Sequence, residues 1–287
     1  MRLGAFLPPW GRYATPEDFD RVAEGVEAMG YDSLWTGDHV VFPEQVVSRY
    51  PYNATGEFPF DRRQPLYEPL TLLAYLAART SRVRLGISVL VLPMRNPVVA
   101  ATQLAGIAAL ARGRLSLGVG VGWMREEFEA LGANFEARGE VMDEWMLILR
   151  RLWRGGGPAP FEGRHYRFPA LAVEPQPAHP ISLLVGGNSR LAMRRAVRLG
   201  DGWHGVRLGP EELAQSVRWL EARLGEEGRG RQAFQVVLRT AAAGGDLEGS
   251  FRRYSDAGVD ELILEVPEAS TDERLEVFEA AAKAVRR

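Results

Sequence analysis

The sequence predicts a (β/α)8 barrel, a TIM barrel formed as a single domain by residues 1–287. The first observation is that apolar runs typical of strands alternate eight times with runs typical of amphipathic helices, which favours a parallel sheet covered by helices. The second is a recurring junction: a helical run ends at Gly, Asp follows within two residues, and an apolar run begins, as at Gly30–Asp32, Gly200–Asp201 and Gly258–Asp260. Eight such units in a chain of this length can close a barrel.

The apolar runs are interpreted as the barrel strands. Most are rich in Leu, Val and Ile, as expected for parallel strands that are buried on both faces. In chain order, their expected ranges are Arg2–Leu7, Ser33–Thr36, Gly86–Val91, Arg114–Val121, Ile181–Val185, Gly202–Val206, Gln235–Ala241 and Glu261–Val266.

The segments between the strands carry helix signals. Thr15, Pro16 and Asp18 have the pattern of an N-cap, a first-turn proline and an acid at the third position. A short helical stretch is expected at 126–131, after the fourth strand. The main helices are expected at Pro16–Met29, Glu68–Thr80, Pro97–Leu110, Arg138–Arg154, Arg190–Leu199, Pro210–Leu224, Leu247–Ala257 and Thr271–Val285.

Two segments interrupt the alternation. Residues 155–180 read as loop, short hairpin and loop, so we expect a loop-hairpin insertion in the barrel and no second domain. Val40–Tyr67 is long but rich in aromatic residues, which argues against disorder. We interpret it as a lid over the site, with plain surface packing as the alternative. Its aromatic residues are Phe42, Tyr50, Tyr52, Phe58, Phe60 and Tyr67.

Composition excludes several classes of function. The chain has no cysteine, so disulfides, thiolate nucleophiles and zinc–thiolate sites are excluded. Lys283, in the terminal helical run, is the only lysine, which argues against Schiff-base chemistry and a phosphate-binding P-loop. The net charge is −2 and the arginines are interspersed with acids, so no nucleic-acid partner is expected. No metal-ligand cluster is visible either.

Targeting signals are also not visible. No apolar run approaches the 18 or so residues that span a membrane, and Leu3–Leu7 is too short for the core of a signal peptide. We therefore expect a cytoplasmic protein that acts on a small-molecule substrate.

Asp38 and His39 are the first candidate site residues. They directly follow the second strand, so they lie at its carboxyl end, where (β/α)8 enzymes place their active sites. Gly37 is expected to let the chain turn sharply before them. A histidine suits proton transfer near neutral pH, with Asp38 positioning a ligand or holding the histidine tautomer. The alternative is that Asp38 caps a turn and His39 is a surface histidine.

Two glycine-rich strand ends are further candidates. Gly118, Gly120 and Gly122 alternate at the end of the fourth strand, which allows a planar ligand to lie against bare backbone. Gly186, Gly187 and Asn188 lead into a helix, where backbone N–H groups and the positive helix end suit a phosphate. An ordinary glycine-assisted turn is the alternative for this second junction.

Six motifs together resemble the luciferase-like monooxygenase superfamily, and more closely its branch that depends on the deazaflavin coenzyme F420. The resemblance runs from end to end of the chain. The motifs are Leu34–His39, Gly86–Leu90, Arg95–Pro97, Gly118–Trp123, Gly186–Gly187 and Gly200–Trp203.

The resemblance implies the roles of several residues. The deazaflavin ring should rest on the second to fourth strands, with Asp38 and His39 beside its reactive edge. A cis peptide bond between Ser88 and Val89 should support the far face of the ring. Gly186 and Gly187 match the phosphate contacts of relatives. Ser88, Val89, Gly120, Gly122 and Asn188 are therefore predicted to bind cofactor together with Asp38, Gly186 and Gly187, and His39 is predicted to be catalytic.

One departure from the motifs of the superfamily argues against a sugar-phosphate substrate. Relatives that oxidise sugar phosphates carry a carboxylate directly after the fourth-strand glycines, whereas this chain has Trp123. Basic residues for a substrate phosphate are not identifiable. We expect an oxidoreductase that transfers hydride between F420 and a small apolar or carbonyl-bearing substrate. The alternatives are an FMN-dependent monooxygenase and a non-catalytic flavin-binding barrel; an unrelated aldolase or isomerase is disfavoured by the single lysine.

Assembly is the last expectation. Members of the superfamily are commonly homodimers or larger, and the helical runs at 68–80 and 97–110 are rich in Ala and Leu with little polar outward face. We therefore expect a homodimer or a higher homo-oligomer.

Overall fold

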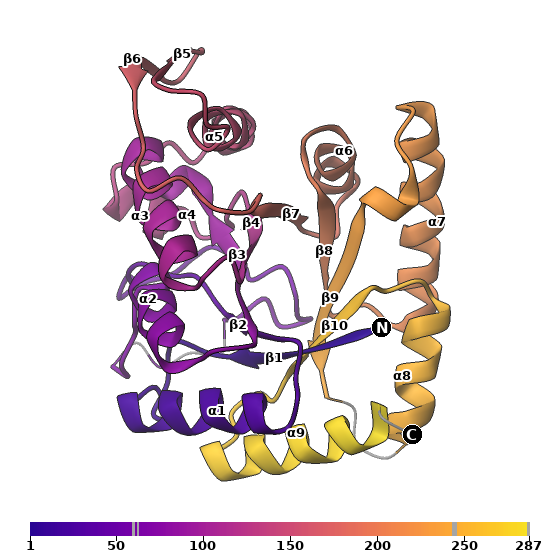
Figure 1. The fold of residues 1–287 in the computed structure, drawn as a ribbon. Helices are drawn as coiled ribbons and strands as arrows, with labels where there is room; N and C mark the ends of the chain where they lie inside the picture. Colours follow the sequence, from indigo (N-terminus) through magenta and orange to yellow (C-terminus); the bar gives the residue numbers. More distant parts are fainter. Residues whose placement is uncertain (59–60, 62, 243–245, 286–287) are drawn as a thin grey trace.

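Eight parallel strands close into a barrel in the computed structural model, which describes residues 1–58, 61, 63–242 and 246–285 (Figure 1). Around the barrel the strand order is β1-β10-β9-β8-β7-β4-β3-β2. The strands are β1 (Arg2–Leu7), β2 (Ser33–Thr36), β3 (Arg84–Val91), β4 (Leu115–Gly120), β7 (Ser182–Gly186), β8 (Gly202–Val206), β9 (Gln235–Ala241) and β10 (Glu261–Glu265). The prediction of a (β/α)8 barrel is confirmed.

Helices cover the outside of the barrel, as Figure 1 shows. Each expected helical run forms a helix within a few residues of its expected ends. The helices are α1 (Pro16–Ala28), α2 (Pro69–Arg79), α3 (Pro97–Leu110), α4 (Arg125–Ala130), α5 (Arg138–Leu152), α6 (Arg190–Leu199), α7 (Pro210–Glu226), α8 (Leu247–Asp256) and α9 (Thr271–Val285), with short 3-10 turns at Leu92–Met94 and Arg231–Ala233. At the start of α1, the Thr15 side chain accepts the N–H of Asp18, as expected for the N-cap.

The recurring Gly–Asp junction has a structural role. The Asp32 carboxylate accepts the N–H of Leu3, the second residue of the neighbouring strand β1, at 2.8 Å. Asp201 and Asp260 make the same bond to Leu183 and Val236, at 2.9 and 2.7 Å. Each junction therefore ties a helix exit to the beginning of the adjacent strand, which satisfies a backbone donor that would otherwise be unpaired at the sheet end.

Residues 155–180 leave the barrel and return to it. Within them β5 (Ala159–Glu162) and β6 (Arg167–Leu171) pair as an antiparallel hairpin. Glu144 of α5 fastens the hairpin turn, because its carboxylate accepts the N–H groups of Arg164, His165 and Tyr166 at 2.6 to 3.1 Å.

The barrel interior is packed below the level of the strand ends. At its amino-terminal end Glu261 is fully buried and accepts bonds from the side chains of Trp35 and Arg84, at 3.0 and 2.6 Å. Above it lie Phe6, Trp35, Leu184, Val237 and Ile263. The carboxyl ends of the strands are left to hold a ligand site. Among the described residues, no helix is long and apolar enough to cross a membrane, and no cluster of acids and histidines could hold a metal ion.

Candidate active site

A cavity of about 920 Å³ opens at the carboxyl ends of the strands. Pockets for cofactors and small molecules have volumes of about 300–1,000 Å³, so this cavity lies near the upper end of that range. All the predicted site residues line it, and they come from the ends of four neighbouring strands. They are Asp38 and His39 after β2, Ser88 and Val89 in β3, Gly120 and Gly122 at β4, and Gly186, Gly187 and Asn188 at β7.

His39 is paired with a carboxylate from α4. Its Nδ1 lies 2.9 Å from Oε2 of Glu127, and the two residues are only 5% and 2% exposed. A carboxylate that accepts from Nδ1 keeps the ring proton there, so Nε2 is left as the proton acceptor. His39 is therefore a buried, oriented histidine, and the alternative of a surface histidine is excluded.

Glu127 was not predicted from the sequence. It follows Glu126 in the first turn of a short helix, where acids are common because they complement the helix dipole. The local pattern therefore gave no signal that one of these two glutamates points inward.

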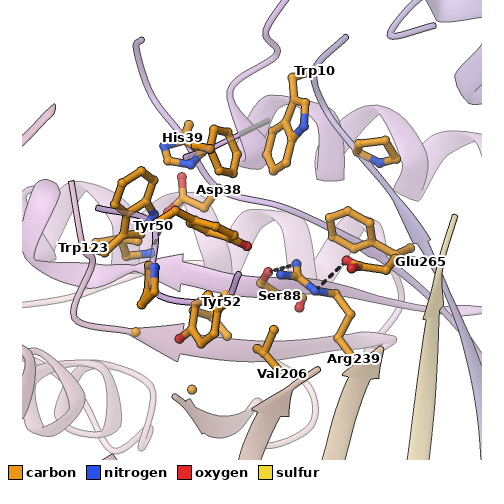
Figure 2. A pocket seen from close by; sticks show the side chains of 18 of the residues that line it. Trp10, Asp38, His39, Tyr50, Tyr52, Ser88, Trp123, Val206, Arg239 and Glu265 are labelled. Atoms are coloured by element: carbon orange, nitrogen blue, oxygen red, sulfur yellow. Dashed lines mark hydrogen bonds and ion pairs between the residues drawn. The ribbon is translucent and has the colours of Figure 1, made fainter. Parts of the chain in front are cut away.

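Aromatic rings surround the imidazole of His39. The ring centroids of Phe42, Phe58 and Trp10 lie 4.6, 4.9 and 5.6 Å from it. Trp123, which stands where relatives carry a carboxylate, lies 6.1 Å away (Figure 2). These rings exclude water from the histidine and make this end of the cavity apolar.

The segment expected to form a lid is fastened to α4. The carboxylate of Glu126 accepts the N–H groups of Val47 and Ser48 at 2.7 and 2.9 Å. The neighbouring glutamate accepts the N–H of Val40 at 2.6 Å. Tyr50, Tyr52 and Phe58 line the cavity from this segment, whereas Phe60 lies outside the described residues.

Asp38 is engaged by protein groups. Its two oxygens accept a bidentate pair from Arg95 at 2.8 and 2.7 Å, and Oδ2 also accepts the N–H of Val91 at 2.6 Å. The expectation that Asp38 could hold the tautomer of His39 is wrong, because Glu127 does so. Asp38 instead ties the end of β2 to the end of β3. The preceding Gly37 has no left-handed φ; it is needed because a Cβ there would collide with the Trp10 ring.

The peptide bond between Ser88 and Val89 is cis, as predicted. The register between β3 and β4 shifts at this point, between Ile87 and Leu90. The Val89 side chain projects over the glycines of the adjoining strands. A Cβ on Gly120 or Gly186 would lie 2.6 or 2.7 Å from the Val89 methyl groups.

The expectation that the fourth-strand glycines leave bare backbone for a planar ligand is therefore wrong for Gly118 and Gly120. Val89 occupies the space above them, since a Cβ on Gly118 would lie 2.8 Å from its Cγ1. The surface offered to a ligand at this point is the bulge of β3.

The junction after β7 forms the other end of the cavity. Gly187 has φ +115°, which favours glycine, but its N–H is donated to the His204 carbonyl at 3.2 Å. The Asn188 amide bonds both backbone groups of Val206, at 2.8 and 3.0 Å. Gly187 and Asn188 thus shape this turn. The Ser189 hydroxyl caps α6 by accepting the N–H of Ala192 at 3.2 Å, so the amides left to meet an anion are those of Arg190 and Leu191, which have no partner inside a helix.

This end of the cavity fits the phosphate of a flavin-type cofactor. The start of α6 offers the N–H groups of Arg190 and Leu191 and the positive end of the helix dipole. The Tyr52 hydroxyl lies 3.9 Å from the position of a Cβ on Gly187. Burial raises the pKa of Tyr52, so its phenol keeps its proton and can donate.

Two arginines that line the cavity were also not predicted from the sequence. Arg239 of β9 and Arg207, directly after β8, both contact the carboxylate of Glu265. All three residues line the cavity, and Figure 2 shows Arg239 beside Glu265. Basic residues that the sequence did not identify are therefore present. A single arginine inside the apolar run of β9, at an inward-facing position, is the signal that could have found Arg239.

Fold and site together define a (β/α)8-barrel enzyme with a large aromatic cavity. The chain belongs to the luciferase-like monooxygenase family, whose model matches residues 1–287, and it is an oxidoreductase.

The chain is also similar in sequence to individual proteins. An uncharacterized protein of Mycobacterium tuberculosis (strain H37Rv) is 35% identical over 243 residues, which cover 85% of this chain and 83% of that protein. The F420-dependent glucose-6-phosphate dehydrogenase of Kineococcus radiotolerans is 31% identical over 223 residues, which cover 74% of this chain and 60% of that enzyme.

Solved structures share the fold. An F420-dependent secondary alcohol dehydrogenase, solved in complex with an F420–acetone adduct, matches 100% of this chain and 99% of its own with a TM-score of 0.80 and 17% identity. A monooxygenase from Streptomyces bottropensis matches 100% of this chain and 99% of its own with a TM-score of 0.75 and 19% identity.

Proposed function

We propose that this protein transfers hydride between coenzyme F420 and a small organic substrate, with His39 as the proton donor or acceptor. The observation that carries the proposal is the buried pair of His39 and Glu127 on the wall of a cavity of about 920 Å³. Sequence relatives that use F420 support this choice of cofactor.

The cavity residues suit the two ends of such a cofactor. The bulge at Ser88 and Val89 offers a support for a ring system, with Gly120, Gly122 and Gly186 shaping the neighbouring strand ends. The turn at Gly187 and Asn188 and the first turn of α6 suit the phosphate. Asp38 would act on the cofactor through the position of β3, because its carboxylate is held by Arg95 and Val91.

The protein's own part in the reaction is proton transfer and positioning. When bound, the deazaflavin supplies or accepts the hydride. His39 takes the proton of a substrate hydroxyl at Nε2 when the substrate is oxidised, and returns it to the carbonyl oxygen in the reverse direction. Glu127 holds the tautomer and stabilises the imidazolium that forms. The rings of Trp10, Phe42 and Phe58 keep water away from these steps.

The second candidate is an FMN-dependent monooxygenase. The likeness to monooxygenases, including an oxygenating component solved with FMN at a TM-score of 0.60, favours it. FMN would use the same phosphate end of the cavity, and His39 would then assist oxygen transfer.

Equilibrium binding separates the two candidates. The apo-protein is titrated with oxidised F420 and, separately, with FMN, and its tryptophan fluorescence is followed; the chain has seven tryptophans, of which Trp10 and Trp123 line the cavity. We expect F420 to quench this fluorescence at much lower concentration than FMN. Tight binding of FMN with none of F420 would reverse the assignment.

A further inference from the structure

Arg239 is a buried cation with more hydrogen-bond donors than partners. It is 8% exposed and lines the cavity. Its Nη1 donates to the Ser88 carbonyl at 2.8 Å, and its Nε lies 3.2 Å from Oε2 of Glu265 but has no hydrogen bond. The Tyr50 hydroxyl also hydrogen-bonds this guanidinium. Because a guanidinium has five N–H donors, the donors that face none of these three residues are left for a group in the cavity.

The cluster around Arg239 carries one surplus positive charge. Arg207 donates to Oε1 of Glu265 at 2.6 Å, so a single buried carboxylate is shared by two guanidinium groups. Tyr50 lies beside Arg239, and its hydroxyl points toward it in Figure 2. Burial raises the pKa of Tyr50, so the phenol remains neutral and does not cancel the charge.

The guanidinium plane is fixed. Cζ of Arg239 stands 4.6 Å from the centre of the Phe6 ring, which packs against one face of the group. The bond to the Ser88 carbonyl fixes one edge. A planar fork held in this way is suited to bidentate recognition of a flat anion.

An aromatic wall connects this cation to His39. The Tyr50 ring lies 5.1 Å from Phe58 and 5.3 Å from Trp123, and Phe58 lies 4.9 Å from the imidazole. A ligand with its charged end at Arg239 would therefore lie along apolar rings and reach the histidine with its other end.

We propose that Arg239 binds the carboxylate of an apolar organic acid, which is the substrate class of the hydride transfer proposed above and rests on that proposal. The surplus of one charge matches a monoanion. A neutral carbonyl would leave the buried charge uncompensated, and a phosphate dianion would meet only one surplus cation beside the negative Glu265.

Benzoate and benzamide test this inference, because they have nearly the same shape and differ in charge. Their dissociation constants are measured by calorimetry with the F420-loaded protein, and again with the apo-protein. We expect benzoate to bind about 10- to 100-fold more tightly than benzamide, the range of a charge-assisted hydrogen bond. Arg239→Gln should remove this preference, and Arg239→Lys, which keeps the charge but not the fork, should reduce it severalfold.

Arg12→Gln is the matched control. Arg12 also lines the cavity but is exposed, so the same change of charge there should leave the preference for benzoate intact. Equal affinities for benzoate and benzamide in the wild type would overturn the inference, and so would a preference that survives Arg239→Gln.

Binding of F420 is measured alongside. If benzoate displaces F420, and Arg239→Gln weakens both to the same degree, the guanidinium serves an oxygen of the cofactor and the inference is wrong. If F420 does not bind but the preference for benzoate depends on Arg239, the carboxylate site stands and the proposed cofactor is wrong.

Discussion

The imidazole of His39 has one nitrogen committed to Glu127, and this determines what the other nitrogen can do. With the proton held at Nδ1, Nε2 is left free to accept a proton, which is the role proposed for it above. The Asp38 carboxylate is instead engaged by Arg95 and by the N–H of Val91. Of the two adjacent residues after β2, Asp38 therefore holds the strand ends together and only His39 is proposed to transfer a proton.

The first prediction concerns the roles of His39 and Glu127 in turnover. His39→Ala should lower kcat by about 10²- to 10⁴-fold, the usual range for general acid–base catalysis, with F420 affinity little changed. Glu127→Gln should also lower kcat, because the imidazolium that forms during proton transfer loses its negative partner. The catalytic role would be contradicted if His39→Ala bound F420 poorly but the F420-loaded fraction of the variant turned over at the normal rate.

The functional residues that could be predicted from the sequence are those that directly follow the end of a strand. His39 was predicted because it directly follows an apolar strand. Glu127 and Arg239 were not, because a helix-start acid and a lone strand arginine have ordinary local explanations. Their inward direction depends on which element faces them, and that information is not local.

At the scale of elements, the strand ends are organised around one side chain. Val89 lies over Gly118, Gly120 and Gly186 of two neighbouring strands, so the glycines make room for a neighbour and do not provide an open surface. The fourth-strand glycines were predicted to leave room for a planar ligand and Gly186 to contact a phosphate, and no local pattern indicated that Val89 fills the space beside them. The strand limits were predicted to within one or two residues, because glycine and proline mark most of them.

The second prediction concerns this packing. Gly120→Ala places a Cβ 2.6 Å from a Val89 methyl group and should destabilise the fold by about 1–3 kcal/mol, as overpacking does. Gly225→Ala, in α7 with nothing within 4 Å of the new Cβ, is the control and should be neutral or stabilise by less than about 1 kcal/mol. Adding Val89→Ala to Gly120→Ala should recover stability. Urea unfolding measures all four proteins; a Gly120→Ala variant as stable as the wild type would be inconsistent with the packing described.

The third prediction concerns His204, which is fully buried inside the barrel. Burial, assisted by nearby Arg239, lowers its pKa from 6.5 to about 4. As the pH falls the unfolded chain therefore takes up this proton first. The contribution of neutral His204 to the free energy of unfolding is fully present above pH 6.5. It is lost as the pH falls toward about 4, and the loss amounts to about 3 kcal/mol.

His204→Leu tests this pH dependence. The difference in unfolding free energy between the variant and the wild type should shift in favour of the variant between pH 6.5 and 4. Denaturant unfolding at a series of pH values measures it. Parallel curves for the two proteins across this range would show that His204 does not titrate as described.

At the scale of the whole molecule, assembly follows from the outer helices. The outward face of α3 combines polar residues with Val99 and Leu110, which are 55% and 64% exposed. We predict a homodimer that buries this face, with a mass from light scattering about twice 31.8 kDa. Leu110→Glu should shift the protein toward monomer, whereas Leu191→Glu on α6, which is 71% exposed, should not. A monomer mass of 31.8 kDa at every concentration would refute it.

The barrel as a whole was predictable because its signal is repeated eight times, so that errors in single elements do not change the conclusion. The arginine-lined end of the cavity was not predictable, since Arg207, Arg239 and Tyr50 meet there from three separate segments. Only closure of the barrel brings them together.

Isotope transfer tests the proposed hydride chemistry most directly. The protein is incubated without oxygen with oxidised F420 and a panel of alcohols and apolar hydroxy acids that carry deuterium on the carbinol carbon, and the cofactor is examined by mass spectrometry. We predict that deuterium passes from the substrate carbon to F420, and that His39→Ala slows this transfer. Turnover that requires reduced FMN and oxygen, with an atom of labelled oxygen found in the product, would contradict the proposal.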